Sequence, residues 1–151
     1  MELGTIEREL YIDAPPEIVF EVVSDPAHVK EWWPDEARYE TVVGSAGEIL
    51  FADDEGGKVE ALTVVDLEPP TRFSFRWTHP ADEEAAEGNS LLVTFELVSQ
   101  GEGTLLRFRE TGFRERGWEA AVLETAYQEH VQGWDYFLPR LVAYAAKVVS
   151  H

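Results

Sequence analysis

The stretch that decides the fold is residues 118–149, WEAAVLETAYQEHVQGWDYFLPRLVAYAAKVV. Its apolar side chains recur every three or four residues, which is the spacing of one face of an α-helix. They are Trp118, Val122, Ala126, Trp134, Phe137, Leu138, Leu141, Val142, Ala145 and Val149. The pattern predicts one amphipathic helix, about 48 Å long at 1.5 Å per residue. A kink is expected at Pro139, whose ring clashes with the carbonyl of Asp135.

The segment before this helix, residues 38–113, alternates apolar and polar side chains with the period of two that is typical of strands. Phe73, Phe75 and Trp77, for example, alternate with polar residues. Strands are predicted at residues 38–43, 47–53, 58–67, 72–78, 90–99 and 104–112. The connections are short and contain turn-forming residues, so consecutive strands should pair as antiparallel hairpins in a meander.

A further strand and two short helices are predicted near the N-terminus. Residues 6–12 alternate in the same way, and Arg8 falls on the apolar side of that strand. Pro16 suits the first turn of a helix. Asp25 is a candidate N-cap for a second helix, which begins at Pro26.

Together these elements predict an α+β fold in one domain, residues 1–151. A curved, seven-stranded antiparallel sheet wraps around the long C-terminal helix, and two short helices follow the first strand. A curved sheet around a helix leaves space between them, and this space is larger where the inward residues are aromatic. We therefore expect an internal cavity.

Composition excludes several classes of function. The 151 residues contain 12 Lys+Arg and 30 Asp+Glu, a formal net charge of −18. Nucleic acids and anionic membranes need a cationic protein face, so neither is an expected partner. The acidic loop around residues 82–87 is predicted to be solvated. No basic leader and no apolar run of about 20 residues is visible, so a cytoplasmic location is expected.

The chain also lacks the usual signatures of metal sites and of catalysis. There is no cysteine, which excludes thiolate nucleophiles and Cys-ligated metals. The histidines, His28, His79, His130 and His151, lack metal-ligand spacing, so we expect no metal and no cofactor. Phosphate-binding loops and nucleophile elbows are also missing, which favours binding over catalysis.

The aromatic residues and a few inward polar residues are the candidate ligand-binding site. The candidate rings are Trp33, Phe51, Phe75, Trp77, Phe95, Trp134 and Phe137. They either fill the core or line a cavity. Glu110 shares a strand face with Leu106 and Phe108, and His130 lies four residues before Trp134 on one side of the helix. Either Glu110 and His130 form a donor–acceptor pair facing a ligand, or Glu110 and Arg8 neutralise neighbours near the rim or reach water by their long side chains.

The order and motifs of the chain resemble those of the START-like, helix-grip (SRPBCC) superfamily. They are most similar to the bacterial branch related to the activator of the 90-kDa heat-shock chaperone's ATPase. The matching segments are residues 12–20 (IDAPPEIVF), Ser24-Asp25-Pro26, Trp32-Trp33-Pro34, Thr111-Gly112-Phe113, residues 130–134 (HVQGW), Phe137-Leu138 and Arg140-Leu141. The resemblance implies a hydrophobic cavity between the sheet and the C-terminal helix, but no reaction. Glu110 stands where a His or a neutral polar residue is often expected.

Three hypotheses about function follow. The first is a protein, monomeric or homodimeric, that binds a small hydrophobic or amphipathic molecule in the cavity. The second is a cyclase- or dehydratase-like enzyme that uses Glu110 and His130 as general base and acid. The third, which comes from the resemblance, is a co-chaperone-like protein that activates an ATPase, with a chaperone as partner. The acidic surface would suit a basic partner.

Overall fold

The computed structural model describes residues 4–52, 57–80 and 82–149, and in this part of the chain it contains seven strands, three α-helices and one 3-10 turn. Residue 53, the end of one predicted strand, and His151 lie outside the described residues. In chain order the elements are β1 (Thr5–Ile12), α1 (Pro16–Ser24), α2 (Pro26–Trp32), β2 (Glu36–Arg38), β3 (Ala46–Phe51), β4 (Lys58–Glu68), β5 (Arg72–Trp77), β6 (Leu91–Gln100), β7 (Gly103–Thr111), η1 (Arg114–Arg116) and α3 (Ala120–Val149).

The strands form one antiparallel sheet in the order β1-β7-β6-β5-β4-β3-β2. Strands β2 to β7 follow one another as the predicted meander. The N-terminal strand β1 pairs with β7, from Thr5 opposite Thr111 to Ile12 opposite Thr104. The predicted α+β class and the seven-stranded antiparallel sheet are confirmed.

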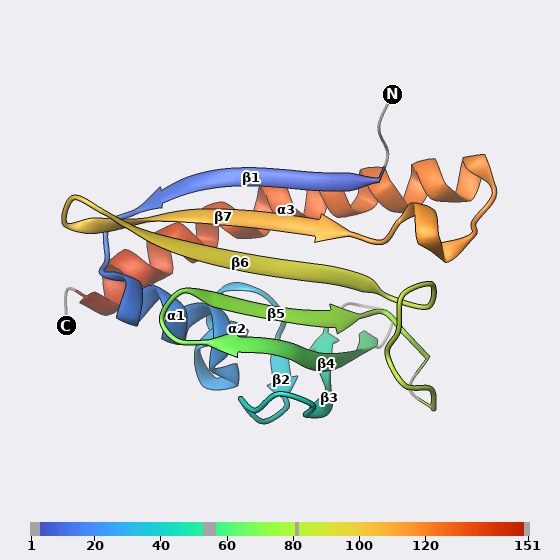
Figure 1. Ribbon diagram of the computed structural model, residues 1–151, viewed down its shortest axis with the longest axis horizontal. Helices are drawn as coiled ribbons and strands as arrows, with labels where there is room; N and C mark the ends of the chain where they lie inside the picture. Colours follow the sequence, from blue (N-terminus) through green and yellow to red (C-terminus); the bar gives the residue numbers. More distant parts are fainter. Residues whose placement is uncertain (1–3, 53–56, 81, 150–151) are drawn as a thin grey trace.

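Helix α3 runs along one face of this sheet, and α1 and α2 lie near the C-terminal end of α3 (Figure 1). Helix α3 begins at Ala120, two residues later than predicted. The preceding Gly117 adopts a left-handed conformation with φ 74°, which ends the 3-10 turn before the helix starts. Beyond this turn α3 is one helix to Val149, with Pro139 inside it.

The short helices have the predicted starts. Pro16 occupies the first turn of α1. The side chain of Asp25 accepts a hydrogen bond of 2.9 Å from the backbone N–H of Ala27 and so caps α2. These two helices bring Trp32 and Trp33, at the end of α2, into the core beneath the sheet.

The strand predicted at residues 38–43 is wrong in position. β2 covers only Glu36–Arg38, and the chain then turns. The turn is held by hydrogen bonds from the N–H of Val42 to the carbonyl of Glu40 and from the N–H of Ser45 to the carbonyl of Val42. Val42 and Val43 are exposed, so their apolar character reflects no buried strand face.

Candidate functional site

Glu110 is a carboxylate on the apolar face of the sheet, near the end of β7. It lies on β7 opposite Ile6 of β1 and Val93 of β6, and both neighbours are buried. The side chain of Glu110 has an exposed fraction of 0%. A charged group in such surroundings is stable only when other groups hydrogen-bond it.

Three donors surround this carboxylate. Trp77 Nε1 donates to Oε2 at 2.7 Å, Trp134 Nε1 donates to Oε1 at 2.9 Å, and His130 Nδ1 lies 2.8 Å from Oε1. We call these four residues the Glu110 cluster. An indole N–H can only donate, so each tryptophan uses one oxygen of Glu110 as its acceptor.

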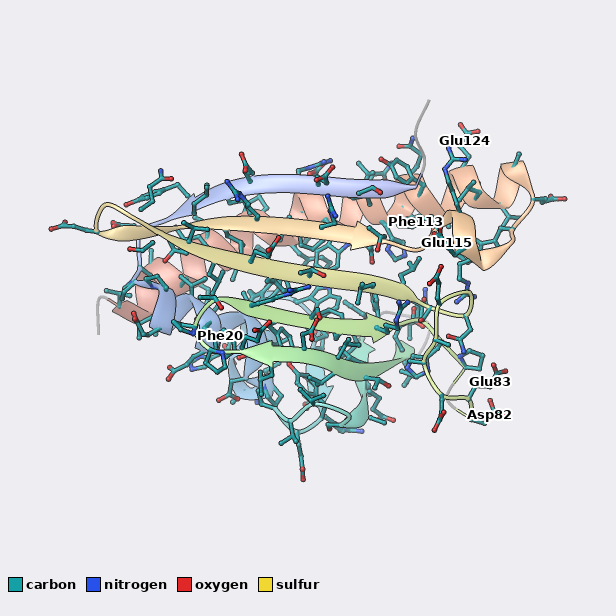
Figure 2. All side chains as sticks on the ribbon, in the orientation of Figure 1. Phe20, Asp82, Glu83, Phe113, Glu115 and Glu124 are labelled. Atoms are coloured by element: carbon teal, nitrogen blue, oxygen red, sulfur yellow. The ribbon has the colours of Figure 1, made fainter. Side chains whose placement is uncertain are left out.

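The cluster also fixes the orientation of the His130 ring. Oε1 already accepts from Trp134 and lies 2.8 Å from Nδ1 of His130, so we assign the proton of this contact to Nδ1. Phe113, which follows β7, packs edge-on against the imidazole with ring centroids 5.3 Å apart, and Trp77 packs on it at the same centroid distance. Figure 2 shows Phe113 between the end of β7 and the first turns of α3. Nε2 of His130 has no hydrogen-bond partner among the described residues.

Trp33 is the centre of the aromatic packing. Its ring centroid lies 4.9 Å from that of Trp134, 5.0 Å from Trp77, 5.6 Å from Phe75 and 5.9 Å from Phe51. Contacts at these distances mean that the rings fill most of the space between the sheet and α3. The sequence left core filling and cavity lining open, and both occur.

A pocket of about 160 Å³ remains beside this packing. It is lined by Trp33, Phe51, Lys58, Trp77, Glu129, His130, Gly133, Trp134 and Phe137. Six of the nine candidate site residues are therefore brought together around one space: Trp33, Phe51, Trp77, His130, Trp134 and Phe137.

The other three candidates lie elsewhere. Glu110 is behind the pocket wall, covered by the side chains that donate to it. Phe75 packs on Phe73 and Trp33 in the core. Phe95 meets the edge of Trp32 at a centroid distance of 6.3 Å, also away from the pocket.

The sequence analysis missed three lining residues. Glu129 and Gly133 lie one residue before His130 and Trp134, and the i, i+4 spacing of 129, 133 and 137 would have placed them beside the predicted face. Lys58 is the cross-strand partner of Phe51 in the β3–β4 hairpin, so the hairpin register would have identified it. Gly133 leaves space at the wall, because a Cβ added there meets no heavy atom within 4 Å.

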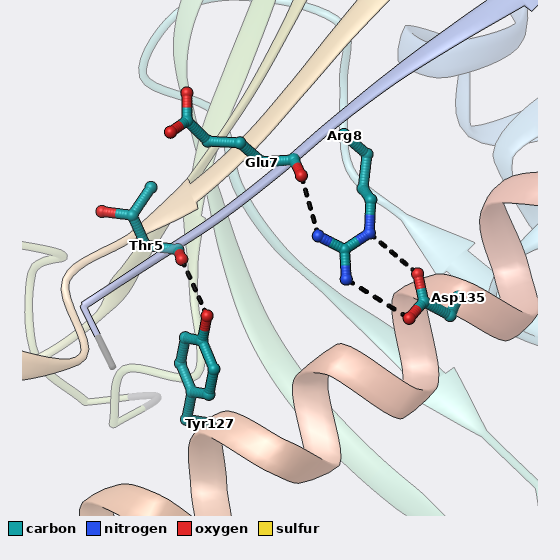
Figure 3. Close-up of polar contacts among 5 residues, drawn as sticks. All are labelled: Thr5, Glu7, Arg8, Tyr127 and Asp135. Atoms are coloured by element: carbon teal, nitrogen blue, oxygen red, sulfur yellow. Dashed lines mark hydrogen bonds and ion pairs between the residues drawn. The ribbon is translucent and has the colours of Figure 1, made fainter. Parts of the chain in front are cut away.

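Arg8 lies outside the pocket lining. Its side chain is on the sheet face that includes Phe108, as the alternation predicts, but it reaches α3 and forms an ion pair with Asp135 (Figure 3). Nε of Arg8 lies 2.9 Å from Oδ1, and Nη2 lies 3.3 Å from Oδ2. Donation of these hydrogen bonds to the Asp135 carboxylate raises the pKa of Arg8 above its ordinary value. Arg8 therefore joins the edge strand β1 to the helix.

A larger hollow, about 740 Å³, lies between the β3–β4 hairpin and the acidic loop. In this loop Asp82 and Glu83 are exposed, at the far end of the sheet in Figure 2. His79 is a buried polar residue of the hollow, and its two ring nitrogens bond Thr63 Oγ1 at 3.2 Å and the carbonyl of Pro80 at 3.0 Å. The hollow is therefore lined by exposed acidic side chains and by a histidine whose two ring nitrogens are both hydrogen-bonded.

The described residues contain no group of three or more His, Asp or Glu side chains placed to hold a metal ion. No helix among them is long and apolar enough to cross a bilayer.

The comparisons with known proteins agree with the fold. The family model described as "Activator of Hsp90 ATPase homolog 1-like protein" matches residues 13–146. No functionally curated protein matches the chain.

Several solved structures are similar over nearly the whole chain. Protein MLL2253 from Mesorhizobium loti is 26% identical, with a TM-score of 0.75, and the match covers 95% of this chain and 97% of that one. Protein NE0264 from Nitrosomonas europaea is 12% identical, with a TM-score of 0.80 and coverage of 100% and 99%. The Aha1 dimer from Colwellia psychrerythraea is 20% identical, with a TM-score of 0.65 and coverage of 91% and 92%.

Proposed function

The chain belongs to the activator of Hsp90 ATPase homolog 1-like family, with the START-like helix-grip fold, and from this premise we propose that it binds a small, largely apolar molecule in the pocket beside the Glu110 cluster. The observation that supports the proposal is the aromatic lining. Five of the lining residues are Trp or Phe, and together with His130 they surround one space between β3–β5 and α3.

The size of the pocket supports a ligand, or part of a ligand, as large as one aromatic ring. A closed apolar cavity of about 150 Å³ accommodates benzene, and this pocket measures about 160 Å³. Burial of a ring contributes roughly 25 cal/mol per Å² of apolar surface removed from water. Lys58 and Glu129 also line the pocket, so the ligand can carry a polar end that remains near them.

Titration with toluene tests this proposal. The protein is titrated with toluene while the indole N–H signals of Trp77 and Trp134 are followed by NMR. The same titration is made with Gly133→Leu, in which the new side chain occupies the open space at residue 133. Binding should weaken about tenfold in Gly133→Leu, which corresponds to 1.4 kcal/mol.

Gly133→Ala is the matched control, because it removes the glycine and adds only one methyl group. It should retain most of the binding. If neither toluene nor a polar ring compound of the same size binds the original protein, the proposal is wrong and the pocket is a packing defect.

A second candidate function is catalysis by His130. It is favoured by the contact of Glu110 with Nδ1, because a carboxylate that holds one ring nitrogen leaves the other to act as a general base. In this arrangement Glu110 is a positioning residue, since its oxygens are already occupied by Trp77, Trp134 and His130. The test measures turnover of a substrate that can cyclise or lose water. Turnover that is lost in His130→Asn, while the substrate still binds, would support this function.

The family description supplies a third candidate, activation of an Hsp90 ATPase. A coupled ATPase assay with an Hsp90 chaperone at low salt tests it directly, and no stimulation would exclude it.

A further inference from the structure

We propose that the ligand presents a neutral hydrogen-bond donor, an O–H or N–H on an aromatic ring, to Nε2 of His130. This inference rests on the proposed function and adds the chemical class of the ligand, which is that of a phenol rather than a hydrocarbon or an aromatic acid.

Two of the three indoles of the pocket wall present only ring surface to a ligand, because their N–H groups are already used. Trp77 and Trp134 both line the pocket, but both of their N–H groups are used by Glu110, at 2.7 and 2.9 Å. Trp33, Phe51 and Phe137 contribute ring surface as well. The polar groups left in the described lining are the charged ends of Lys58 and Glu129, the indole N–H of Trp33, which can only donate, and the ring of His130.

The contact with Glu110 determines which nitrogen of His130 is available to a ligand. In the imidazole tautomer whose single N–H is at Nδ1 and faces Oε1, Nε2 carries a lone pair that can accept a hydrogen bond. A ligand that occupies the pocket without a donor leaves this nitrogen dry and without a partner, which is unfavourable. A ligand with an O–H or N–H restores the hydrogen bond that water would make.

The same cluster disfavours an anionic ligand. The buried carboxylate of Glu110 lies directly behind the pocket wall, and Glu129 is an acidic residue of the lining itself. The chain as a whole carries a formal net charge of −18. Lys58 is the cation of the described lining, and its Nζ already lies 3.6 Å from Oε2 of Glu60. A carboxylate on the ring would meet more negative than positive charge, and it would also face the lone pair of Nε2.

Four compounds of similar size separate these possibilities: toluene, which has no polar group; anisole, which only accepts; phenol, which donates; and benzoate, which is an anion. Each is titrated against the original protein and His130→Asn. Asparagine places its amide N–H near the position of Nδ1, so Glu110 keeps its third donor while the acceptor Nε2 is removed. The ¹⁵N shifts of the imidazole report its tautomer and a hydrogen bond at Nε2.

The expected result is a preference for phenol over anisole and toluene that falls about fivefold in His130→Asn, the effect of one hydrogen bond. The signal of Nε2 should shift with phenol alone, a readout that needs no variant. Benzoate should bind weakest.

Two results would overturn the inference in different ways. Equal binding of toluene, anisole and phenol, or a preference for anisole or benzoate, removes the donor class while the pocket stands as a binding site. No binding of any compound at concentrations up to about 10 mM, which detects a millimolar Kd, removes the proposed function together with it.

Discussion

Trp77 of the sheet and Trp134 of the helix donate their indole N–H groups to the two different oxygens of one carboxylate, at 2.7 and 2.9 Å. The ring centroids of the two tryptophans lie 6.1 Å apart, so they also pack on each other. The buried carboxylate of Glu110 therefore joins β5, β7 and α3 at one point. The contacts that hold the layers together also build the wall of the pocket.

Glu110→Gln should destabilise the protein by about 3 kcal/mol, because the amide keeps one acceptor oxygen and turns an N–H₂ group toward donors. At least one of Trp77, His130 and Trp134 then loses its partner in a dry environment. Urea unfolding measures the change in the free energy of unfolding.

Glu96→Gln is the control for this substitution. Glu96 is exposed on β6, and the same change there should alter stability by less than about 0.5 kcal/mol. Equal effects of the two substitutions would show that the Glu110 cluster contributes nothing beyond ordinary surface charge.

The ion pair between Arg8 and Asp135 should contribute little to stability despite its bidentate geometry. The two side chains are 35% and 52% exposed, so water and salt screen their attraction. A double-mutant cycle with Arg8→Met and Asp135→Asn should give a coupling energy of about 0.5 kcal/mol that decreases in 1 M salt. A coupling of several kcal/mol that is insensitive to salt would contradict this expectation.

Tyr39 should make stability fall at alkaline pH. Burial, and secondly the negative charge of Asp25, raise the pKa of Tyr39 above its ordinary value of 10.0. The unfolded chain therefore releases this proton first, so the stability that Tyr39 contributes is complete below pH 10 and is lost as the pH rises above it. In Tyr39→Phe the decline above pH 10 should be less steep.

Denaturation midpoints between pH 7 and 11 test the role of Tyr39. At neutral pH the variant should lose about 1 kcal/mol, since the Tyr39 hydroxyl donates a 2.7 Å hydrogen bond to the carbonyl of Ser24. Tyr136→Phe is the control, because Tyr136 is 60% exposed. An unchanged alkaline slope in Tyr39→Phe would contradict the prediction.

Much of this architecture was accessible from the sequence because it depends on local periodicity. Alternation along β7 put Glu110 on the face of Leu106 and Phe108, and helical spacing put His130 with Trp134. The strand at 38–43 was misplaced, because Val42 and Val43 have strand-like character in a turn that backbone hydrogen bonds close.

Periodicity does not fix the position of α3 along its axis relative to the strands. That position places His130 against Glu110, 20 residues away in sequence, and Trp134 against Trp77. Nor does alternation distinguish a ring in the core from one at a pocket. Phe95 and Phe51 both face inward, yet Phe95 is 1% exposed on the interior strand β6, whereas Phe51 is near the sheet edge and lines the pocket.

Two glycines should respond in opposite directions to the same substitution. Gly133→Ala should stabilise the protein by about 1 kcal/mol, because glycine is unfavourable inside a helix and the new Cβ meets no atom within 4 Å. Gly47→Ala should destabilise it by about 1–3 kcal/mol, because the new Cβ would lie 2.7 Å from Cβ of Tyr39 and would overlap the backbone carbonyl of Arg38. Thermal unfolding of both variants measures the contrast.

If Gly133→Ala stabilises the protein and leaves toluene binding nearly intact, the glycine is a helix defect that the fold tolerates and the space beside it is available to a ligand. Loss of stability in Gly133→Ala would mean that the space at residue 133 is closed in solution.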